Sequence, residues 1–427
     1  MKRFSQLALC LSVFVIHNMA QAYPLDAAAD TGIQRLEGYR QAQLNKVYGR
    51  LLPQGAQLAS GQIKLRLLAR PTLQLPPADE TFSRELVALL QEVSNQQADA
   101  FGMAVLDLSN PDRPVYAEHR GGAYFNPGSV GKVAVAMGVF QALANAWPDD
   151  IEARRKVLRE SIITADDFIG YDHHTVPIWD GQRLTARKIQ VGDKNNLWSY
   201  LDWMLSASSN AAASMVVKHM MLLSRFGREY PLPVVAERRF FADTPRAELS
   251  RLLASSFQAG LAGSGLDSRH FRQGKFFSST GKRRVPGQTS HATPRELLRF
   301  LLHLEQGEVV DGFSSLEIKR LLYITQRRIR YASSPALNDA AVYFKSGSFY
   351  RCRHEPGFSC GKYRGNATNL LNSVAIIEAP AGAGEGEGLF YMVVLTSNVL
   401  KHNAALLHQG IGTRLHRLIE KRNSARQ

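Results

Sequence analysis

Apolar residues recur along the chain with two different periods, and the period changes from one segment to the next. Residues 80–93 have helical spacing and predict one amphipathic helix. The segments 101–108 and 115–120 are typical of strands, and the polar stretch 110–114 between them predicts a turn, so the three predict a hairpin. Residues 125–144 then begin a helix that is apolar on nearly all sides, which we expect in the centre of a domain.

The second half of the chain is first helical in pattern and then returns to strands. Residues 150–300 follow helical spacing with polar loops between, and 275–291 is predicted to be a long loop. Thr293 is predicted to cap a helix that starts at Pro294. Three strand patterns and a last helix follow, over residues 341–349, 373–379, 389–396 and 407–418. This order predicts an α+β fold, an α/β sandwich in which both chain ends build one antiparallel sheet and the middle forms a helical lobe.

The N-terminus has the pattern of a secretory signal peptide over residues 1–22. Two basic residues precede the apolar stretch 7–16, and Ala20-Gln21-Ala22 offers a small-x-small cleavage site. That stretch is too short to span a bilayer, and no transmembrane segment is evident in the rest of the chain. We therefore expect a protein secreted across the inner membrane, periplasmic or extracellular, with an N-terminal extension at 23–79 and the main domain at 80–427.

Charge and cysteine content narrow the class of partner and the compartment. Of the 427 residues, 52 are Lys or Arg and 37 are Asp or Glu, a formal net charge of +15. This balance favours contact with anionic cell-envelope polymers or describes a merely solvated basic surface, and no nucleic-acid-binding module is recognisable. Cys352 and Cys360 remain after the signal peptide, and in an oxidising compartment we expect them to form a disulfide.

The start of the apolar helix carries the first candidate chemistry. Ser129 and Lys132 are three residues apart, so on a helix the amine can reach the hydroxyl. A serine becomes a nucleophile when an adjacent base takes its proton, and a lysine can be that base if burial lowers its pKa. The apolar helix behind the pair provides such burial. A capping serine beside a surface lysine is the alternative interpretation of this motif alone.

Two further motifs add to the first. Ser208 lies near Asn210 between two helical runs, where the hydroxyl could relay a proton and the amide could hold the lysine and a substrate carbonyl. Lys345, Ser346 and Gly347 lie inside a predicted strand. A glycine there indicates that something approaches the backbone closely, and we expect a substrate to lie against this edge strand at Gly347. The two preceding side chains suit an anionic substrate group. A helix cap and a charged edge strand are the alternative interpretations.

In the order S-x-x-K, S-x-N, K-S-G, these motifs resemble those of the penicillin-recognising serine enzymes, the β-lactamases and penicillin-binding proteins, and the class A β-lactamase branch most of all. The resemblance covers about residues 80–422. It implies a β-lactamase/transpeptidase-like fold and an acyl-serine mechanism without a cofactor. The implied roles are nucleophile for Ser129, base for Lys132, proton relay for Ser208 and positioning for Asn210.

The resemblance also implies how the substrate is held and what it is. Lys345, Ser346 and Ser348 would bind the substrate carboxylate, and the backbone amides of Ser129 and Ser348 would form an oxyanion hole. The implied substrate is a small-molecule β-lactam or a peptide derived from peptidoglycan. Class A enzymes hydrolyse their acyl-enzyme with a loop glutamate, in an E-x-x-L-N pattern before the helix that starts at Thr-Pro. Here the only carboxylate between Glu248 and Glu296 is Asp267.

Three functions therefore stay open. The first is a secreted serine hydrolase that opens a β-lactam or a related amide. The second is a D-Ala-peptide peptidase or transpeptidase with slow deacylation, and the third is a sensor of β-lactams or wall fragments without turnover. A metal site in the acidic and histidine-rich stretch 166–174 is conceivable, but adjacent histidines cannot easily point to one ion, so we expect a polar loop and no metal.

Overall fold

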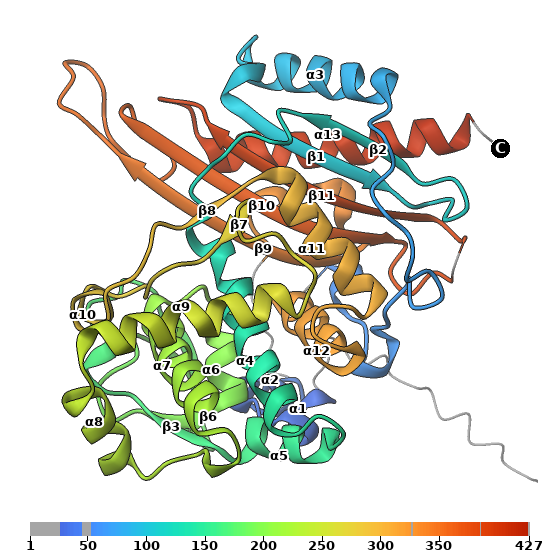
Figure 1. Ribbon diagram of the computed structural model, residues 1–427. Coiled ribbons are helices and arrows are strands. Elements are labelled where there is room, and N and C mark those ends of the chain that lie inside the picture. The colour runs from blue at the N-terminus through green and yellow to red at the C-terminus, as the bar shows by residue number, and fades with distance from the viewer. Residues whose placement is uncertain (1–25, 45–52, 326–327, 385, 426–427) are drawn as a thin grey trace, which may run out of the picture.

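The computed structural model describes residues 26–44, 53–325, 328–384 and 386–425, and it is built around a five-stranded antiparallel sheet (Figure 1). The strand order is β2-β1-β11-β10-β9, and every neighbouring pair is antiparallel. The strands are β1 (Phe101–Asp107), β2 (Val115–His119), β9 (Ala341–Arg351), β10 (Thr368–Ala379) and β11 (Leu389–Asn398). Because β1 and β2 precede the helical region and the other three follow it, both parts of the chain supply the sheet, as predicted.

Helices cover both faces of the sheet, so its strands are buried on two sides. On β1, Met103 and Val105 belong to one apolar cluster and Ala104 and Leu106 to the other, as the alternation of side chains along a strand requires. One face packs on α3 and α13, and the other on α11 and α12 (Figure 1). These helices are α3 (Glu80–Ser94), α11 (Pro294–Gln306), α12 (Gly312–Tyr323) and α13 (Ala404–Ser424).

A helical lobe occupies the middle of the chain, below the sheet in Figure 1. Its helices are α4 (Lys132–Ala146), α5 (Ile151–Glu160), α6 (Leu197–Leu205), α7 (Asn210–Phe226), α8 (Val234–Asp243), α9 (Arg246–Ala262) and α10 (Ser279–Arg284). Three short strand pairs join its loops: β3 (Ile162–Thr164) with β6 (Lys194–Asn196), β4 (Val176–Trp179) with β5 (Leu184–Arg187), and β7 (Phe271–Arg272) with β8 (His291–Ala292).

Helix α4 runs through the core of this lobe. The segment Gly128–Ala146, which includes α4, is long and apolar enough to cross a membrane, but 78% of its apolar 18-residue window is buried inside the protein. It packs against α7 and α9, and Gly138 and Gly260 let α4 and α9 approach closely, since a Cβ on Gly260 would lie 2.7 Å from the Gly138 nitrogen. The apolar surface of α4 is therefore covered by protein, as expected for a central helix.

The segment that precedes α3 packs on both parts of the molecule. It contains α1 (Ala27–Thr31), α2 (Gln34–Leu44) and short 3-10 turns, and its buried residues Leu36, Ile63 and Leu67 belong to the same apolar cluster as the lobe. The predicted domain boundary at residue 79 stays a prediction. The predicted signal peptide, residues 1–22, lies outside the described residues.

The fold class, the hairpin, the three late strands and the helix that Thr293 caps are confirmed. One loop prediction was wrong in part, because the predicted loop 275–291 contains α10. Its N-cap is Ser278, whose Oγ accepts from the Gly281 nitrogen at 3.0 Å. A helix of six residues is too short to show an apolar period, which is why the sequence pattern did not reveal it.

Candidate active site

Ser129 and Lys132 lie at the junction between a 3-10 turn and the central helix. The turn η4 (Gly128–Gly131) runs directly into α4, whose first residue is Lys132. Gly128 adopts a φ of +52°, which favours glycine and lets the chain turn sharply before the serine. Lys132 Nζ lies 3.0 Å from Ser129 Oγ. The predicted hydroxyl–amine pair is therefore formed.

Oxygen atoms of the second motif hold the Lys132 amine from the other side. Lys132 Nζ donates to the backbone oxygen of Ser208 at 2.6 Å and to Asn210 Oδ1 at 2.8 Å. The side chain is fully buried, and this burial lowers the pKa of Lys132 to about 7, against the opposing charge of Asp172. A lysine with this pKa carries a free amine on a large fraction of molecules at neutral pH, as a general base must.

Ser208 lies between the two lysines of the predicted site. Its Oγ is 3.4 Å from Lys132 Nζ and accepts from Lys345 Nζ at 2.9 Å. Ser208 has a φ of +60°, an uncommon conformation for a residue other than glycine that often marks functional sites. The next residue, Ser209, caps α7 by accepting from the Ala212 nitrogen. The turn before α7 therefore presents Ser208 and Asn210 to Lys132.

Strand β9 brings the third motif to the same place. Lys345 is buried and also donates to the backbone oxygen of Ser346 at 2.9 Å. Burial, together with the charges of Lys132 and Arg330, lowers the pKa of Lys345 well below its ordinary value. Lys132, which shares the Ser208 hydroxyl, thus disfavours the charged form of Lys345.

The backbone of the Ser129 turn, not a substrate, makes the close approach seen at Gly347, and the predicted substrate contact stays a prediction. A Cβ on Gly347 would lie 2.6 Å from the Ser129 nitrogen and 2.8 Å from the Pro127 oxygen. Any larger residue would push η4 away from β9. The Ser348 nitrogen lies beside the same turn, 3.9 Å from where a Cβ on Gly128 would be. The two predicted oxyanion-hole amides therefore belong to one small region.

Arg330 is a site residue that the sequence did not reveal. It lies in the 3-10 turn η7 (Arg330–Ser333) and donates to Ser346 Oγ at 2.6 Å and to Ser348 Oγ at 3.2 Å. Its guanidinium also donates to the Tyr363 hydroxyl at 2.9 Å. No motif surrounds Arg330, so only its position in space distinguishes it from the many other arginines. Two other arginines nearby in the sequence, Arg351 and Arg353, are exposed.

Three carboxylates that come before Thr293 in the sequence are the candidates to replace the missing loop glutamate, and none of them bonds to Lys132 in the described structure. Glu237 is buried in α8 and accepts from Lys218 at 2.9 Å, whereas Glu248 is exposed on α9 and Asp267 pairs with Arg269 at 2.7 Å.

The loop before Thr293 places an aromatic ring beside Lys132, because the ring centroid of Phe277 lies 5.0 Å from Lys132 Nζ. Among the described residues, no carboxylate forms a hydrogen bond or ion pair with Lys132.

The acidic and histidine-rich stretch provides one group with the spacing of metal ligands. Donor atoms of Asp172, His173 and His174 lie within 4.8 Å of one another. Both oxygens of Asp172 already accept hydrogen bonds, five in all, from three backbone amides and two side chains. A carboxylate has about four lone-pair positions, so this one has none left for an ion. We therefore assign no metal to it.

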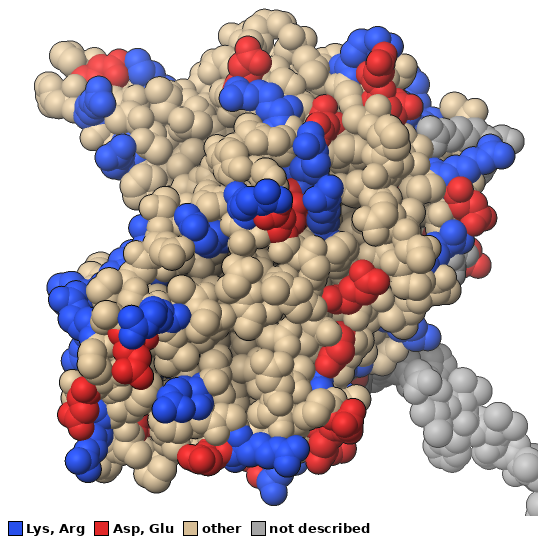
Figure 2. All heavy atoms as spheres, viewed as in Figure 1, with Lys and Arg blue, Asp and Glu red and all other residues tan. Residues whose placement is uncertain are grey.

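The disulfide between Cys352 and Cys360 is present, with a Cα–Cα distance of 6.0 Å. It closes the loop between β9 and β10, which projects from the upper left of the molecule in Figure 1 and carries basic side chains in Figure 2. The loop leaves β9, the strand that carries Lys345 and Ser346. After the second cysteine it contains Tyr363, whose hydroxyl accepts a hydrogen bond from Arg330. The disulfide therefore restrains a loop that contacts the site through Arg330.

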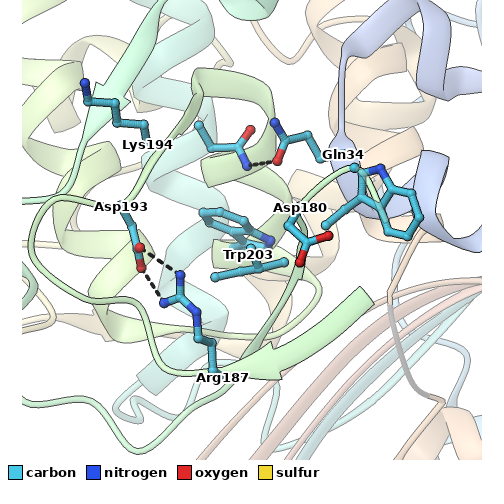
Figure 3. A pocket seen from close by; sticks show the side chains of 10 residues that line it. Gln34, Asp180, Arg187, Asp193, Lys194 and Trp203 are labelled. Carbon is cyan, nitrogen blue, oxygen red and sulfur yellow. Dashed lines mark hydrogen bonds and ion pairs between the residues drawn. The ribbon is translucent and has the colours of Figure 1, made fainter. Parts of the chain in front are cut away.

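A separate pocket of about 480 Å³ lies between the β4–β5 hairpin and α2 (Figure 3). Its polar groups bind one another, because Arg187 pairs with Asp193 at 2.7 Å and Gln34 Oε1 accepts from Asn195 at 2.9 Å. Trp203 donates its ring nitrogen to the Pro177 oxygen at 3.0 Å. None of the predicted site residues lines this pocket. We interpret it as packing that attaches α2 to the lobe.

Comparisons with known proteins agree with the fold. The sequence model of the beta-lactamase enzyme family matches residues 84–418. No curated protein sequence matches the chain. A β-lactamase from Chitinophaga pinensis DSM 2588 is 17% identical with a TM-score of 0.50, covering 80% of this chain and 99% of that one.

Two further solved structures give the same result. The TLA-3 extended-spectrum β-lactamase is 11% identical with a TM-score of 0.51, covering 80% of this chain and 98% of that one. A variant of GNCA4, the class A β-lactamase of the last common ancestor of Gram-negative bacteria, is 17% identical with a TM-score of 0.50, covering 81% and 100%. At such low identity these similarities show the fold alone.

Proposed function

This chain belongs to the beta-lactamase enzyme family, and on that premise we propose that it is a serine hydrolase that opens a β-lactam or a related amide through an acyl-serine. The observation that carries the proposal is the position of Lys132. Its buried amine, with a pKa of about 7, lies 3.0 Å from the hydroxyl of Ser129. This arrangement meets the requirement for a serine nucleophile, an adjacent base that is uncharged at working pH.

Acylation follows from this geometry. Ser129 Oγ attacks the substrate carbonyl carbon while its proton passes to Lys132 Nζ. The C–N bond of the amide then breaks, and the leaving nitrogen needs a proton. Ser208 contacts both lysines and can deliver that proton while Lys132 or Lys345 replaces it. Amides of Ser129 and Ser348 would stabilise the oxyanion, with about 3 kcal/mol expected from each donor.

Recognition of an anionic substrate is the second part of the proposal. Lys345, Ser346, Ser348 and Arg330 place an amine, a guanidinium cation and two hydroxyls on one edge of the site. Arginine presents a planar pair of donors that suits a carboxylate. Penicillins and wall peptides that end in a free carboxylate both offer this group, so the substrate is a small-molecule β-lactam or a peptidoglycan-derived peptide.

A second candidate function is a D-Ala-peptide peptidase or transpeptidase with a long-lived acyl-enzyme. This function is favoured because the ring of Phe277 lies beside Lys132 and the loop before Thr293 has no carboxylate to offer there. Hydrolysis of the acyl-serine requires a base for the attacking water. If Lys132 is the only base available to that water, deacylation is slow. The β-lactamase and the penicillin-binding function then differ in the rate of deacylation rather than in chemistry.

We also propose that the protein is exported and works in the periplasm or outside the cell. The signal-peptide pattern of residues 1–22 supports this, and the Cys352–Cys360 disulfide suits an oxidising compartment. Expression of the full chain with mass analysis of the product tests it. Export is supported by a mature form that begins at Tyr23, and an uncut cytoplasmic product contradicts it.

A fluorescent penicillin tests the catalytic proposal. We expect the wild-type protein to be labelled on Ser129, and Ser129→Ala to remain unlabelled. Ser255→Ala, which changes an exposed serine of α9, is the matched control and should be labelled normally. Release of the label within seconds indicates a β-lactamase, whereas persistent label indicates the penicillin-binding type. An unlabelled wild type that still binds penicillin by calorimetry would support a sensor instead.

A further inference from the structure

A carboxylate from a neighbouring loop lies beneath the start of α7, where the second motif is. Asp172 Oδ2 accepts hydrogen bonds from the Asn210 nitrogen at 2.7 Å, the Ala211 nitrogen at 2.9 Å and Ser209 Oγ at 2.8 Å. Class A enzymes carry a carboxylate inside this motif, S-D-N. This chain has Ser209 at that position, and Asp172 approaches it from outside the motif.

The other oxygen of Asp172 holds a histidine. Asp172 Oδ1 accepts from His174 Nδ1 at 2.6 Å and from the His174 backbone nitrogen at 3.1 Å. Although burial acts in the opposite direction, hydrogen bonds from His174 and the Ala211 amide hold the pKa of Asp172 below its usual range. The carboxylate is therefore ionised, and the His174 ring is the side chain that fixes its outer oxygen.

From His174 an unbroken series of hydrogen bonds leads to the nucleophile. It runs through Asp172 to the Asn210 backbone, from Asn210 Oδ1 to Lys132 at 2.8 Å, and from Lys132 to Ser129. The charged or titratable groups that act on His174 are Asp172 and His173 of its own loop and Lys132 of α4. The His173 ring is tilted by 32° against the His174 ring, with the two centroids 4.0 Å apart, and among the described contacts it has no hydrogen bond to a member of the series.

We propose that His174 is a positioning residue for acylation: by fixing Asp172 beneath the start of α7, it holds Asn210 against Lys132. This inference rests on the proposed function. Removing the ring would take one of the five hydrogen bonds from the Asp172 carboxylate, leaving Oδ1 with the His174 backbone amide alone. The carboxylate and Asn210 would then be held less firmly, and the negative charge would be less neutralised by hydrogen bonds. That charge raises the pKa of Lys132, so the pH at which acylation reaches half of its maximal rate would increase.

Three variants and one probe test the proposal. The second-order rate constant for labelling by fluorescent penicillin is measured from pH 5.5 to 9.5 in the wild type, His174→Ala, His174→Asn and His173→Ala. We expect His174→Ala to be labelled about tenfold more slowly at pH 7.5, the loss of about 1.4 kcal/mol in transition-state stabilisation, with its midpoint shifted upward. His174→Asn keeps an N–H near Nδ1 and should restore rate and midpoint, and His173→Ala should match the wild type.

The outcomes separate this inference from the function on which it rests. If the wild type is not labelled on Ser129, the proposed function fails. If the wild type is labelled and a folded His174→Ala protein has the same rate and midpoint, the positioning role is refuted. If His174→Ala does not fold, His174→Asn provides the test. A folded His174→Asn protein that is labelled tenfold more slowly than the wild type also refutes the role of the Nδ1 donor.

Discussion

At the scale of single residues, the site depends on a lysine kept in an environment that disfavours its charge. Lys132 has no exposed surface, and its described partners are hydroxyl, amide and carbonyl oxygens. Such oxygens satisfy its hydrogen bonds without supplying the negative charge that would hold its proton. Burial therefore serves catalysis at a cost in stability.

That cost predicts a dependence of stability on pH. The pKa of Lys132 is about 7 in the folded protein, against an ordinary value of 10.5 that we assign to the unfolded chain. Between pH 7 and pH 10.5 the unfolded chain therefore keeps a proton on this amine that the folded chain has lost. The free energy of unfolding of the wild type should thus rise with pH relative to Lys132→Met, by about 1.4 kcal/mol per pH unit. Urea denaturation at pH 7.5 and 9.5 measures the difference, with exposed Lys156→Met as the control. A constant difference between wild type and Lys132→Met would contradict the buried, uncharged amine.

Phe277 predicts the rate of the second chemical step. Because its ring lies beside Lys132 and the loop provides no carboxylate there, replacing it by glutamate should supply a base for the hydrolytic water. We expect Phe277→Glu to release the penicillin label at least tenfold faster than the wild type, with acylation shifted to higher pH by the new negative charge. Stopped-flow or gel-based release of label measures both effects.

The matched control for this change is Phe277→Gln, which has the same shape as the glutamate variant but no charge. It should acylate and retain its label as the wild type does. If Phe277→Gln releases the label as fast as Phe277→Glu, loosening of the loop rather than general-base catalysis accounts for the effect.

Residue types at fixed spacing were visible in the sequence, and contacts between distant segments were not. The pairing of Ser129 with Lys132 follows from helical geometry, and the structure forms it. Arg330 and Asp172 lie outside every motif and reach the site because β9 and α7 bring distant loops together. No local pattern distinguishes Arg330, and the acidic and histidine-rich stretch that contains Asp172 was weighed only as a metal site or a polar loop, so neither contact was predicted.

At the scale of elements, long periodic segments were predictable and short ones were not. The hairpin, α3 and the three late strands have enough residues for a period to be recognised. The paired strands β3 to β8 have two to four residues each and exist because neighbouring loops align their backbones. Their stability comes from tertiary contact, which a single-sequence pattern does not contain.

The turn η7 and the loop closed by the disulfide form one side of the anion site, which predicts an effect on substrate binding. Arg330→Gln removes the charge that contacts Ser346 and Ser348, so the apparent dissociation constant of a carboxylate-bearing penicillin should rise about tenfold or more. The limiting rate of acylation should change little, because Arg330 does not contact Lys132 or Ser129. Labelling over a range of penicillin concentrations separates the two constants.

Arg353→Gln provides the control for this prediction, because it removes an exposed charge from the loop that the disulfide closes, which lies beside the turn of Arg330. It should leave the apparent dissociation constant unchanged. If both variants weaken binding equally, the overall positive charge around the site, rather than the contact of Arg330 with Ser346 and Ser348 of β9, governs affinity.

At the scale of the whole molecule, the segment before α3 joins the two parts of the fold through buried charges. Arg35 of α2 pairs with Asp202 of α6 at 2.5 Å, and both side chains are fully buried. Near the sheet, Lys319 of α12 binds Glu378 of β10 at 2.7 Å and donates to the Lys64 backbone oxygen at 2.6 Å. This segment lies outside the family resemblance, and the sequence predicts only an extension that packs on or tethers the main domain. The residues that attach it to both parts of the fold are not visible in its pattern.

These contacts predict that the described N-terminal segment unfolds together with the lobe. Arg35→Met leaves Asp202 buried without its partner, which should cost about 3–5 kcal/mol of the free energy of unfolding. Arg40→Met breaks an ion pair with Glu37 on the same helix, but that pair is largely exposed and should cost at most about 1 kcal/mol. Adding Asp202→Leu to Arg35→Met should recover much of the loss, because the double variant removes the unpaired charge.

Urea denaturation followed by tryptophan fluorescence measures all three variants, since Trp198 and Trp203 lie in α6 beside Asp202. A loss in Arg35→Met no larger than in Arg40→Met would mean that the segment is an appendage whose attachment the lobe does not need.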